Sequence, residues 1–226
     1  MTLPRKPPLL IALDLLSPVL IIGTLVLIVF FTPVEVTMGP VQKVFYFHVA
    51  SAWASMLSFV IAALAGGAYL SQRRPQWDWL SLSAIEVGVV FGLAAILSGM
   101  IWARPIWNTW WVWDPRLTTT AIMELIYLSY FILRSSLNTD EAKARLGAVY
   151  AIVSVITVPL TFLSIRLFRT IHPVVIAASG DTGFNMSPRM LTAFIVSLVV
   201  FSILLADLVW NRYHIAARQA RLIQES

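Results

Sequence analysis

The sequence predicts an all-α, polytopic membrane protein with six transmembrane helices, both termini in the cytoplasm, and an external tryptophan-rich loop between the third and fourth helices. Two observations lead to this prediction. Of the 226 residues, 59% are hydrophobic and only 12% are charged, with a mean hydropathy of +0.82, whereas soluble domains carry about 25% charged residues. The apolar residues also gather into runs that could cross a bilayer, which takes ~20 helical residues. We expect residues 1–226 to form a single integral membrane domain.

The first two apolar runs are separated by a turn-forming segment. A short basic head precedes an apolar run that Asp14 and Pro18 interrupt, so we expect the first span to begin near Leu16. This run has no small-residue cleavage site, which indicates a retained helix rather than a removed signal peptide. Pro33, Gly39 and Pro40 then predict a loop.

The remaining runs are divided by basic turns and by the tryptophan-rich stretch. Arg73, Arg74 and Pro75 mark the turn after the second span, and Pro159 predicts a kink within the fifth. The expected spans are 16–32, 44–70, 82–102, 118–133, 146–168 and 191–209. An even number of spans places both termini on one side of the membrane.

The distribution of basic residues selects that side. Ten of the sixteen lysines and arginines fall in the segments that share a side with the termini, and six fall in the opposite loops. Because basic residues favour cytoplasmic loops, the termini are predicted to be cytoplasmic. The tryptophan-rich loop therefore faces outward, as do the loops after the first and fifth spans.

The segment from Trp102 to Arg116 is the most unusual part of the chain. It reads W-A-R-P-I-W-N-T-W-W-V-W-D-P-R. One or two tryptophans at a membrane boundary would be ordinary, since the indole is apolar with one polar N–H. Five within twelve residues indicate a platform for a large planar ligand; they are Trp102, Trp107, Trp110, Trp111 and Trp113.

The three histidines divide between the two sides. His48 lies about one turn inside the outer end of the second span, and His172 lies in the loop after the fifth. His214 lies in the basic tail on the opposite side, where a solvated interface residue is the simpler interpretation. Two neutral imidazoles beside an aromatic platform are what a bis-histidine haem iron requires. His48 and His172 are therefore candidate metal ligands.

Haem would also need partners for its anionic propionates. Arg104 and Arg116 flank the platform, and a guanidinium can hold a carboxylate through two parallel hydrogen bonds. Arg169 and Lys43 are alternates. Each of these cations could instead be a boundary residue that reaches towards lipid head groups. Asp114 fits better as an acceptor that orders the loop than as a ligand contact.

Two acidic residues fall within the spans. Glu86 lies near the cytoplasmic start of the third, and Glu124 lies nearly two turns into the fourth. Carboxylates inside a membrane are costly and are often functional. Glu86 could be interfacial, and Glu124 could be a satisfied contact beneath the ligand site.

Composition narrows the chemistry. The chain contains no cysteine, so disulfides, thiolate metal sites, thiol nucleophiles and the C-x-x-C-H haem attachment motif are all absent. The net charge of +5 fits loop charges that set topology better than nucleic-acid binding. We expect no catalytic residue in this chain. Three function classes stay open: a haem-binding handover protein, a permease subunit exporting haem or another solute, and an enzyme that forms a covalent haem bond.

Three motifs together resemble the WWD haem-handling proteins, and specifically the six-helix CcmC family of bacterial cytochrome c biogenesis. They are W-x-x-P-x-W-x-T-W-W-V-W-D-x-R-L-T from Trp102, V-F-Y-F-H-V-A-S-A-W around His48 and S-I-R-L-F-R-T-I-H-P around His172. Where the family usually has glycine after the first two tryptophans, this chain has Ala103 and Asn108.

The resemblance implies a specific role. His48 and His172 would be the axial ligands of haem b, and residues Trp102 to Asp114 would form its platform. The protein would hold haem at the outer face of the inner (cytoplasmic) membrane and present it to the haem chaperone CcmE. It would work with the ABC transporter subunits CcmA and CcmB and with the small protein CcmD. It would thus assist covalent haem attachment on a partner.

Overall fold

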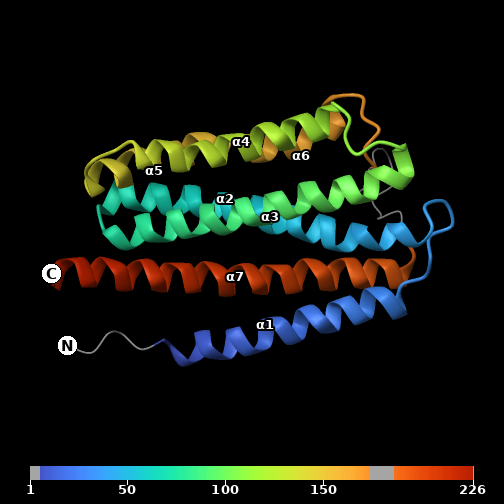
Figure 1. Ribbon diagram of the computed structural model, residues 1–226, viewed down its shortest axis with the longest axis horizontal. Helices are drawn as coiled ribbons and strands as arrows, with labels where there is room; N and C mark the ends of the chain where they lie inside the picture. Colours follow the sequence, from blue (N-terminus) through green and yellow to red (C-terminus); the bar gives the residue numbers. More distant parts are fainter. Residues whose placement is uncertain (1–5, 174–185, 226) are drawn as a thin grey trace.

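The computed structural model describes residues 6–173 and 186–225, which form a bundle of long helices running roughly side by side (Figure 1). Within the described ranges, six helical segments are long and apolar enough to span a membrane, as predicted. The helices are α1 Pro8–Val26, α2 Val44–Gln72, α3 Pro75–Trp107, α4 Pro115–Ser135, α5 Asp140–Ser154, α6 Thr157–Leu167 and α7 Pro188–Glu225. A π-helical segment, Leu27–Phe31, continues α1, and a 3₁₀ turn, Pro40–Lys43, precedes α2.

Most helices begin earlier than the apolar runs suggest, and the reason is proline. Helices α1, α3, α4 and α7 begin at Pro8, Pro75, Pro115 and Pro188. Proline suits the first helical position because its missing N–H would have no partner there and its φ is already helical. Pro75, Pro115 and Pro188 start their helices in or beside polar sequence, before the hydropathy rises.

The fifth span is broken in two, which confirms the kink expected at Pro159. Helix α5 ends at Ser154, and α6 starts at Thr157, with Pro159 as its third residue. Proline has no N–H to donate and its ring clashes with the carbonyl four residues earlier, here that of Val155. The clash therefore falls inside the break.

The main hydrophobic core is built around α2 and α3, with side chains added by α4, α5 and α7. The most extensive packing is between α2 and α3, and small residues make it possible. A Cβ on Gly88 would lie 2.7 Å from the ring of Phe59. Phe59 in turn stacks on Tyr127 of α4, with ring planes 4° apart. Small residues at helix contacts are typical of membrane bundles, and here they bring α2 and α3 close enough to support a shared site.

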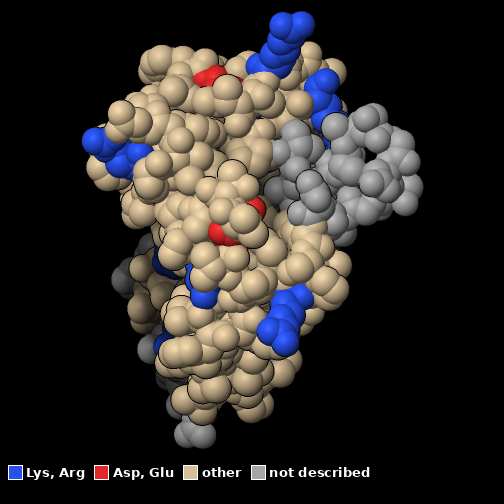
Figure 2. Space-filling model, turned by 90° about the vertical axis from the view of Figure 1, so that its right-hand side faces the viewer, with Lys and Arg blue, Asp and Glu red and all other residues tan. Residues whose placement is uncertain are grey.

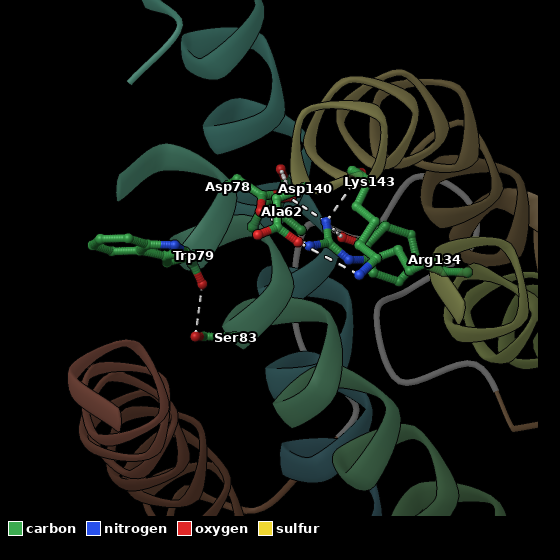
Figure 3. Close-up of polar contacts among 9 residues, drawn as sticks. Ala62, Asp78, Trp79, Ser83, Arg134, Asp140 and Lys143 are labelled. Carbon is green, nitrogen blue, oxygen red and sulfur yellow. Dashed lines mark hydrogen bonds and ion pairs between the residues drawn. The ribbon is translucent and has the colours of Figure 1, made fainter. Parts of the chain in front are cut away.

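Charged side chains connect the helices at the end of the bundle that carries the termini. Arg134 of α4 makes a bidentate pair with Asp78 of α3, at 2.6 and 3.0 Å, and also donates to the carbonyl of Lys143 (Figure 3). On the other side of α3, Glu86 makes a bidentate pair with Arg212 of α7. Glu86 is thus part of an ion pair between helices.

Both termini emerge at the same end of the bundle (Figure 1). Helix α1 packs mainly against α7, where Ser17 donates to Asp207 at 2.6 Å. The opposite end carries the loop after α1, the tryptophan-rich segment and the segment after α6 (Figure 1). The six-helix arrangement therefore gathers the predicted site elements at one end. Arg5, one of the basic residues counted for topology, lies outside the described residues.

Candidate functional site

His48 and His172 come together although 123 residues separate them in the sequence. Their ring centroids are 6.4 Å apart and the ring planes are inclined by 39°. His48 projects from the second turn of α2, and His172 belongs to the irregular segment that follows α6. His214 lies on α7, towards the end that carries the termini.

Each imidazole has its Nδ1 tied to a backbone carbonyl. His48 Nδ1 lies 2.8 Å from the carbonyl oxygen of Ala95, and His172 Nδ1 lies 3.1 Å from that of Pro173. A carbonyl can only accept, so Nδ1 is the protonated nitrogen of both rings. This leaves both Nε2 lone pairs available. Metal-bound histidines show the same arrangement, in which the outer N–H fixes the tautomer and the ring orientation.

The spacing of the rings fits a metal between them. Two metal–imidazole bonds of about 2 Å each, plus roughly 1 Å from each nitrogen to its ring centre, place axial imidazole centroids about 6 Å apart. The observed 6.4 Å agrees with that value. No group of three or more potential ligands from His, Asp and Glu occurs among the described residues. The pair therefore suits a metal whose other ligands come from a macrocycle such as haem.

Helix α3 provides the surface on which His48 rests. A Cβ on Gly99 would lie 2.9 Å from His48 Cε1, and Ala95, one turn earlier, supplies the carbonyl that fixes Nδ1. A larger residue at Gly99 would therefore push the His48 ring away. Neither Ala95 nor Gly99 stands out in the sequence as a site residue. Two small residues four positions apart are nevertheless a known signal for close helix packing.

Asp114 joins the tryptophan-rich segment to the segment that carries His172. Its carboxylate accepts hydrogen bonds from Thr170 Oγ1 at 2.7 Å, from Ile171 N at 2.9 Å and from Arg116 N at 2.9 Å. The last bond caps the N-terminus of α4. Asp114 thus orders the loop, as the sequence suggested, and does so by fixing the residues just before His172. Thr170 was missed by sequence reasoning.

The protonation states of the two loop residues follow from these contacts. Burial acts to raise the pKa of Asp114, but the hydrogen bonds from Thr170, Ile171 and Arg116 outweigh it and hold the pKa below its ordinary value. Burial, followed by the positive charge of Arg116, lowers the pKa of His172 to about 4. Near neutral pH, Asp114 is therefore ionised and His172 is neutral, which is the form that binds a metal.

The two arginines of the motif are placed differently. Arg116 lies close enough to His172 to lower its pKa, and its guanidinium donates to the carbonyl of Thr161 in α6. Arg104 is exposed and donates to the carbonyl of Asn108 at 2.9 Å and to its side chain. Arg116 is thus beside the histidine pair, while Arg104 is bound to the end of its own helix.

The tryptophans form two edge-to-face pairs rather than one flat shelf. Trp102 and Trp107 lie in the last turns of α3 with ring planes 88° apart, and Trp111 and Trp113 lie in the loop with planes 80° apart. Asn108 ends α3 in the left-handed region at φ 55°, which explains why asparagine can stand where glycine is usual. Trp110 and Trp113 are 53% and 78% exposed. Their faces are available to a ligand, to lipid or to a partner.

The end of the molecule that carries these residues is shown in Figure 2. Its lysines and arginines are spread out rather than gathered into one patch. Lys43, one of the alternates for a propionate, donates to the carbonyl of Val29 at 2.5 Å. An anionic ligand at this end would depend on individual cations such as Arg116.

Known proteins similar to this chain identify its family. The model of the family described as Heme exporter protein C matches residues 5–225. The chain is 30% identical over 193 residues to Heme exporter protein C of Bradyrhizobium diazoefficiens, covering 85% of this chain and 71% of that protein. It is 26% identical over 184 residues to Heme exporter protein C of Escherichia coli K12, covering 80% of this chain and 73% of that protein.

A mitochondrial relative matches as well. A ccmC-like cytochrome c biosynthesis protein of Marchantia polymorpha is 28% identical over 155 residues, which cover 69% of this chain and 65% of that protein. The family model covers nearly the whole chain, including both histidine segments and the tryptophan-rich segment. The chain therefore belongs to the CcmC family, Heme exporter protein C.

Proposed function

We propose that this protein handles haem for cytochrome c maturation by holding haem b between His48 and His172 and presenting it to the chaperone CcmE. The single observation that carries the proposal is the histidine pair. Its centroids are 6.4 Å apart and both Nδ1 atoms are tied to carbonyls, so both Nε2 atoms are free to bind iron. The names of the relatives, which refer to heme export and to cytochrome c biosynthesis, support the same role.

Each part of the site has a task in this proposal. His48 and His172 bind the iron, which as cargo supplies no chemistry to this chain. Arg116 is the first candidate for a propionate because it lies beside the pair, and Arg104 is the second. Asp114 keeps His172 in place through Thr170 and Ile171. Trp110 and Trp113 cover the macrocycle or contact the chaperone, Trp111 packs against Trp113, and Trp102 and Trp107 extend the aromatic surface.

The proposal also assigns a place and partners. The site lies at the end of the bundle opposite both termini (Figure 1). The ten-to-six division of basic residues puts that end outside the cytoplasmic membrane, facing the periplasm in a bacterium with an outer membrane. The expected partners are the transporter subunits CcmA and CcmB, the small protein CcmD and the chaperone CcmE.

An absorption spectrum of the purified protein tests the proposal. The wild type should show a sharp Soret band of a six-coordinate, low-spin haem. His48→Gly and His172→Gly should each lose or shift that band, because the iron would lose one strong imidazole ligand. Free imidazole added to either variant should restore it, since the small molecule can enter the space left by the side chain.

His214→Gly is the matched control, because it removes a histidine from the opposite end of the same protein. It should leave the spectrum unchanged. The same spectrum in all three variants, or no haem in the wild type, would contradict the proposal. Covalent haem on co-expressed CcmE then measures the handover step separately.

A further inference from the structure

A buried polar cluster lies between α2, α3 and α4, below the histidine pair. It consists of Ser51 and Ser55 of α2 and Glu124 and Tyr127 of α4, with exposed fractions of 0, 1, 3 and 0%. The side-chain oxygens of all four are buried and have no hydrogen-bond partner among the described residues. Unsatisfied polar groups in a membrane interior are costly, so four together indicate a site rather than ordinary packing.

The carboxyl group of Glu124 is fitted closely into this cluster. A Cβ on Gly92 of α3 would lie 2.1 Å from Glu124 Oε2 and 3.1 Å from Ser55 Oγ. Only glycine leaves room for the carboxyl group there. Glu124 Oε2 therefore sits against α3 near the Ser55 hydroxyl group, and neither carboxyl oxygen has a hydrogen-bond partner among the described residues.

Glu124 forms no ion pair with any residue that the structure describes. Glu86 of α3 is paired with Arg212, and Arg116, about two turns before Glu124 on α4, donates to the carbonyl of Thr161. The titratable and charged residues on the helices around the cluster include His48 on α2, Glu86 on α3, Arg116, Tyr127 and Tyr130 on α4, Tyr150 on α5, Arg166 on α6, and Asp207 and Arg212 on α7.

The cluster is close to the histidine pair on the scale of electrostatic interactions. His48 rests on Gly99 and the Glu124 carboxyl group rests on Gly92, both on α3. Seven residues of helix rise by about 10 Å. At that distance, and at the effective dielectric constant of about 20 that suits protein sites, a unit charge changes the proton affinity of a carboxyl group by about tenfold.

We propose that Glu124 is a proton-exchanging group whose protonation is coupled to the charge of the haem iron held by His48 and His172. This inference rests on the proposed haem site. A one-electron donor, such as the dithionite-reduced mediator of a potentiometric titration, gives one electron to ferric iron, which becomes ferrous, and one positive charge is thereby removed from the site. Glu124 then takes up one proton from water and becomes a neutral carboxylic acid. Oxidation reverses both steps, so charge is conserved within the buried region.

Potentiometric titration of the haem-loaded protein at a series of pH values tests the coupling. The wild-type midpoint potential should fall as pH rises through the range in which Glu124 titrates. A tenfold difference in proton affinity corresponds to a total fall of about 59 mV for a one-electron couple. Glu124→Gln should lose this part of the pH dependence, and Glu124→Asp should retain a carboxyl group and some of it.

Glu141→Gln is the matched control, because Glu141 is an exposed glutamate at the other end of the bundle. It should behave as the wild type. Redox-induced infrared difference spectra supply a second measurement, in which the carbonyl band of a protonated carboxylic acid should grow on reduction in the wild type and be missing in Glu124→Gln.

The outcomes separate the two proposals. If the wild type binds no haem, the proposed function fails. If haem binds through both histidines but Glu124→Gln keeps the full pH dependence and the infrared band, the haem site stands and Glu124 is only a buried neutral acid.

Discussion

At the scale of single residues, Asp114 connects three parts of the candidate site. It caps α4 and accepts from both Thr170 and Ile171, which directly precede His172. One carboxylate therefore holds together the tryptophan-rich segment, the start of the fourth span and the residues next to the second candidate ligand. Thr170 is 56 residues away in the sequence, and no local pattern could have identified it as the partner.

Asp114→Asn should weaken haem binding by about tenfold or more. Hydrogen bonds to a charged acceptor contribute ~1.5–3 kcal/mol each, and an amide cannot accept all three. Soret titration gives the dissociation constant. Thr170→Val should show part of the same loss, and the double variant should lose less than the sum of the two because the side chains share one bond. Purely additive losses would indicate that Asp114 does not act through Thr170.

Gly99→Ala should reduce haem affinity even though alanine favours a helix over glycine by ~1 kcal/mol. The added Cβ would stand 2.9 Å from the His48 ring, which must then move. Gly67→Ala is the control, because a Cβ on Gly67 meets nothing within 4 Å. Thermal unfolding and Soret titration of both variants separate stability from binding. Equal affinity in the two variants would contradict the assigned role of Gly99.

At the scale of helices, the pairing of Asp78 with Arg134 holds α3 and α4 together at the end carrying the termini (Figure 3). Both side chains are largely buried, at 10 and 14% exposure. Removing one member of a buried pair leaves the other charge without compensation, which typically costs ~3–5 kcal/mol. Replacing both by apolar residues removes that cost.

Asp78→Asn should therefore lower the thermal unfolding temperature in detergent markedly, and Asp78→Leu with Arg134→Met should recover most of the loss. Asp140→Asn is the comparison, since the Asp140 side chain is 98% exposed and pairs with Lys143 at only 3.5 Å; it should change little. If the double variant is no more stable than Asp78→Asn, the loss reflects packing rather than the buried charge.

Sequence patterns predicted these helices better in number than in extent. The six apolar runs identified six spans. In lipid, every backbone N–H and C=O group must find a hydrogen-bond partner within the protein, and a helix long enough to cross the membrane meets this requirement. The ends of the helices were harder to predict from hydropathy. Helix α3, for example, begins at Pro75 in polar sequence and continues through Arg104 and Pro105 to Trp107. The meeting of His48 and His172 was expected from their shared side, but its 6.4 Å spacing results from tertiary packing.

At the scale of the whole molecule, the position of both termini at one end fixes the relative orientation of every loop (Figure 1). The absence of cysteine makes this testable without removing native thiols. Val36 lies in the loop after the first span and is 99% exposed, so a cysteine at this position should be accessible. Asn138→Cys lies in the exposed turn between α4 and α5, at the opposite end.

In intact cells, a membrane-impermeant maleimide should label the Val36→Cys protein, and it should reach the Asn138→Cys protein only after lysis. The unmodified chain, which has no thiol, gives the background. Labelling of Asn138→Cys before lysis would place the histidine pair on the cytoplasmic side and reverse the proposed direction of haem presentation.

The two candidate ligands are mounted on supports of unequal stiffness. His48 is part of a helix wall, resting on Gly99 and tied to Ala95 within the most extensive packing of the bundle. His172 stands on irregular backbone whose position depends on Asp114. Irregular segments open at lower free energy than packed helices. On gradual heating, the haem spectrum should therefore turn five-coordinate before the helical circular dichroism falls. We expect His172 to leave the iron first, while His48 still holds it.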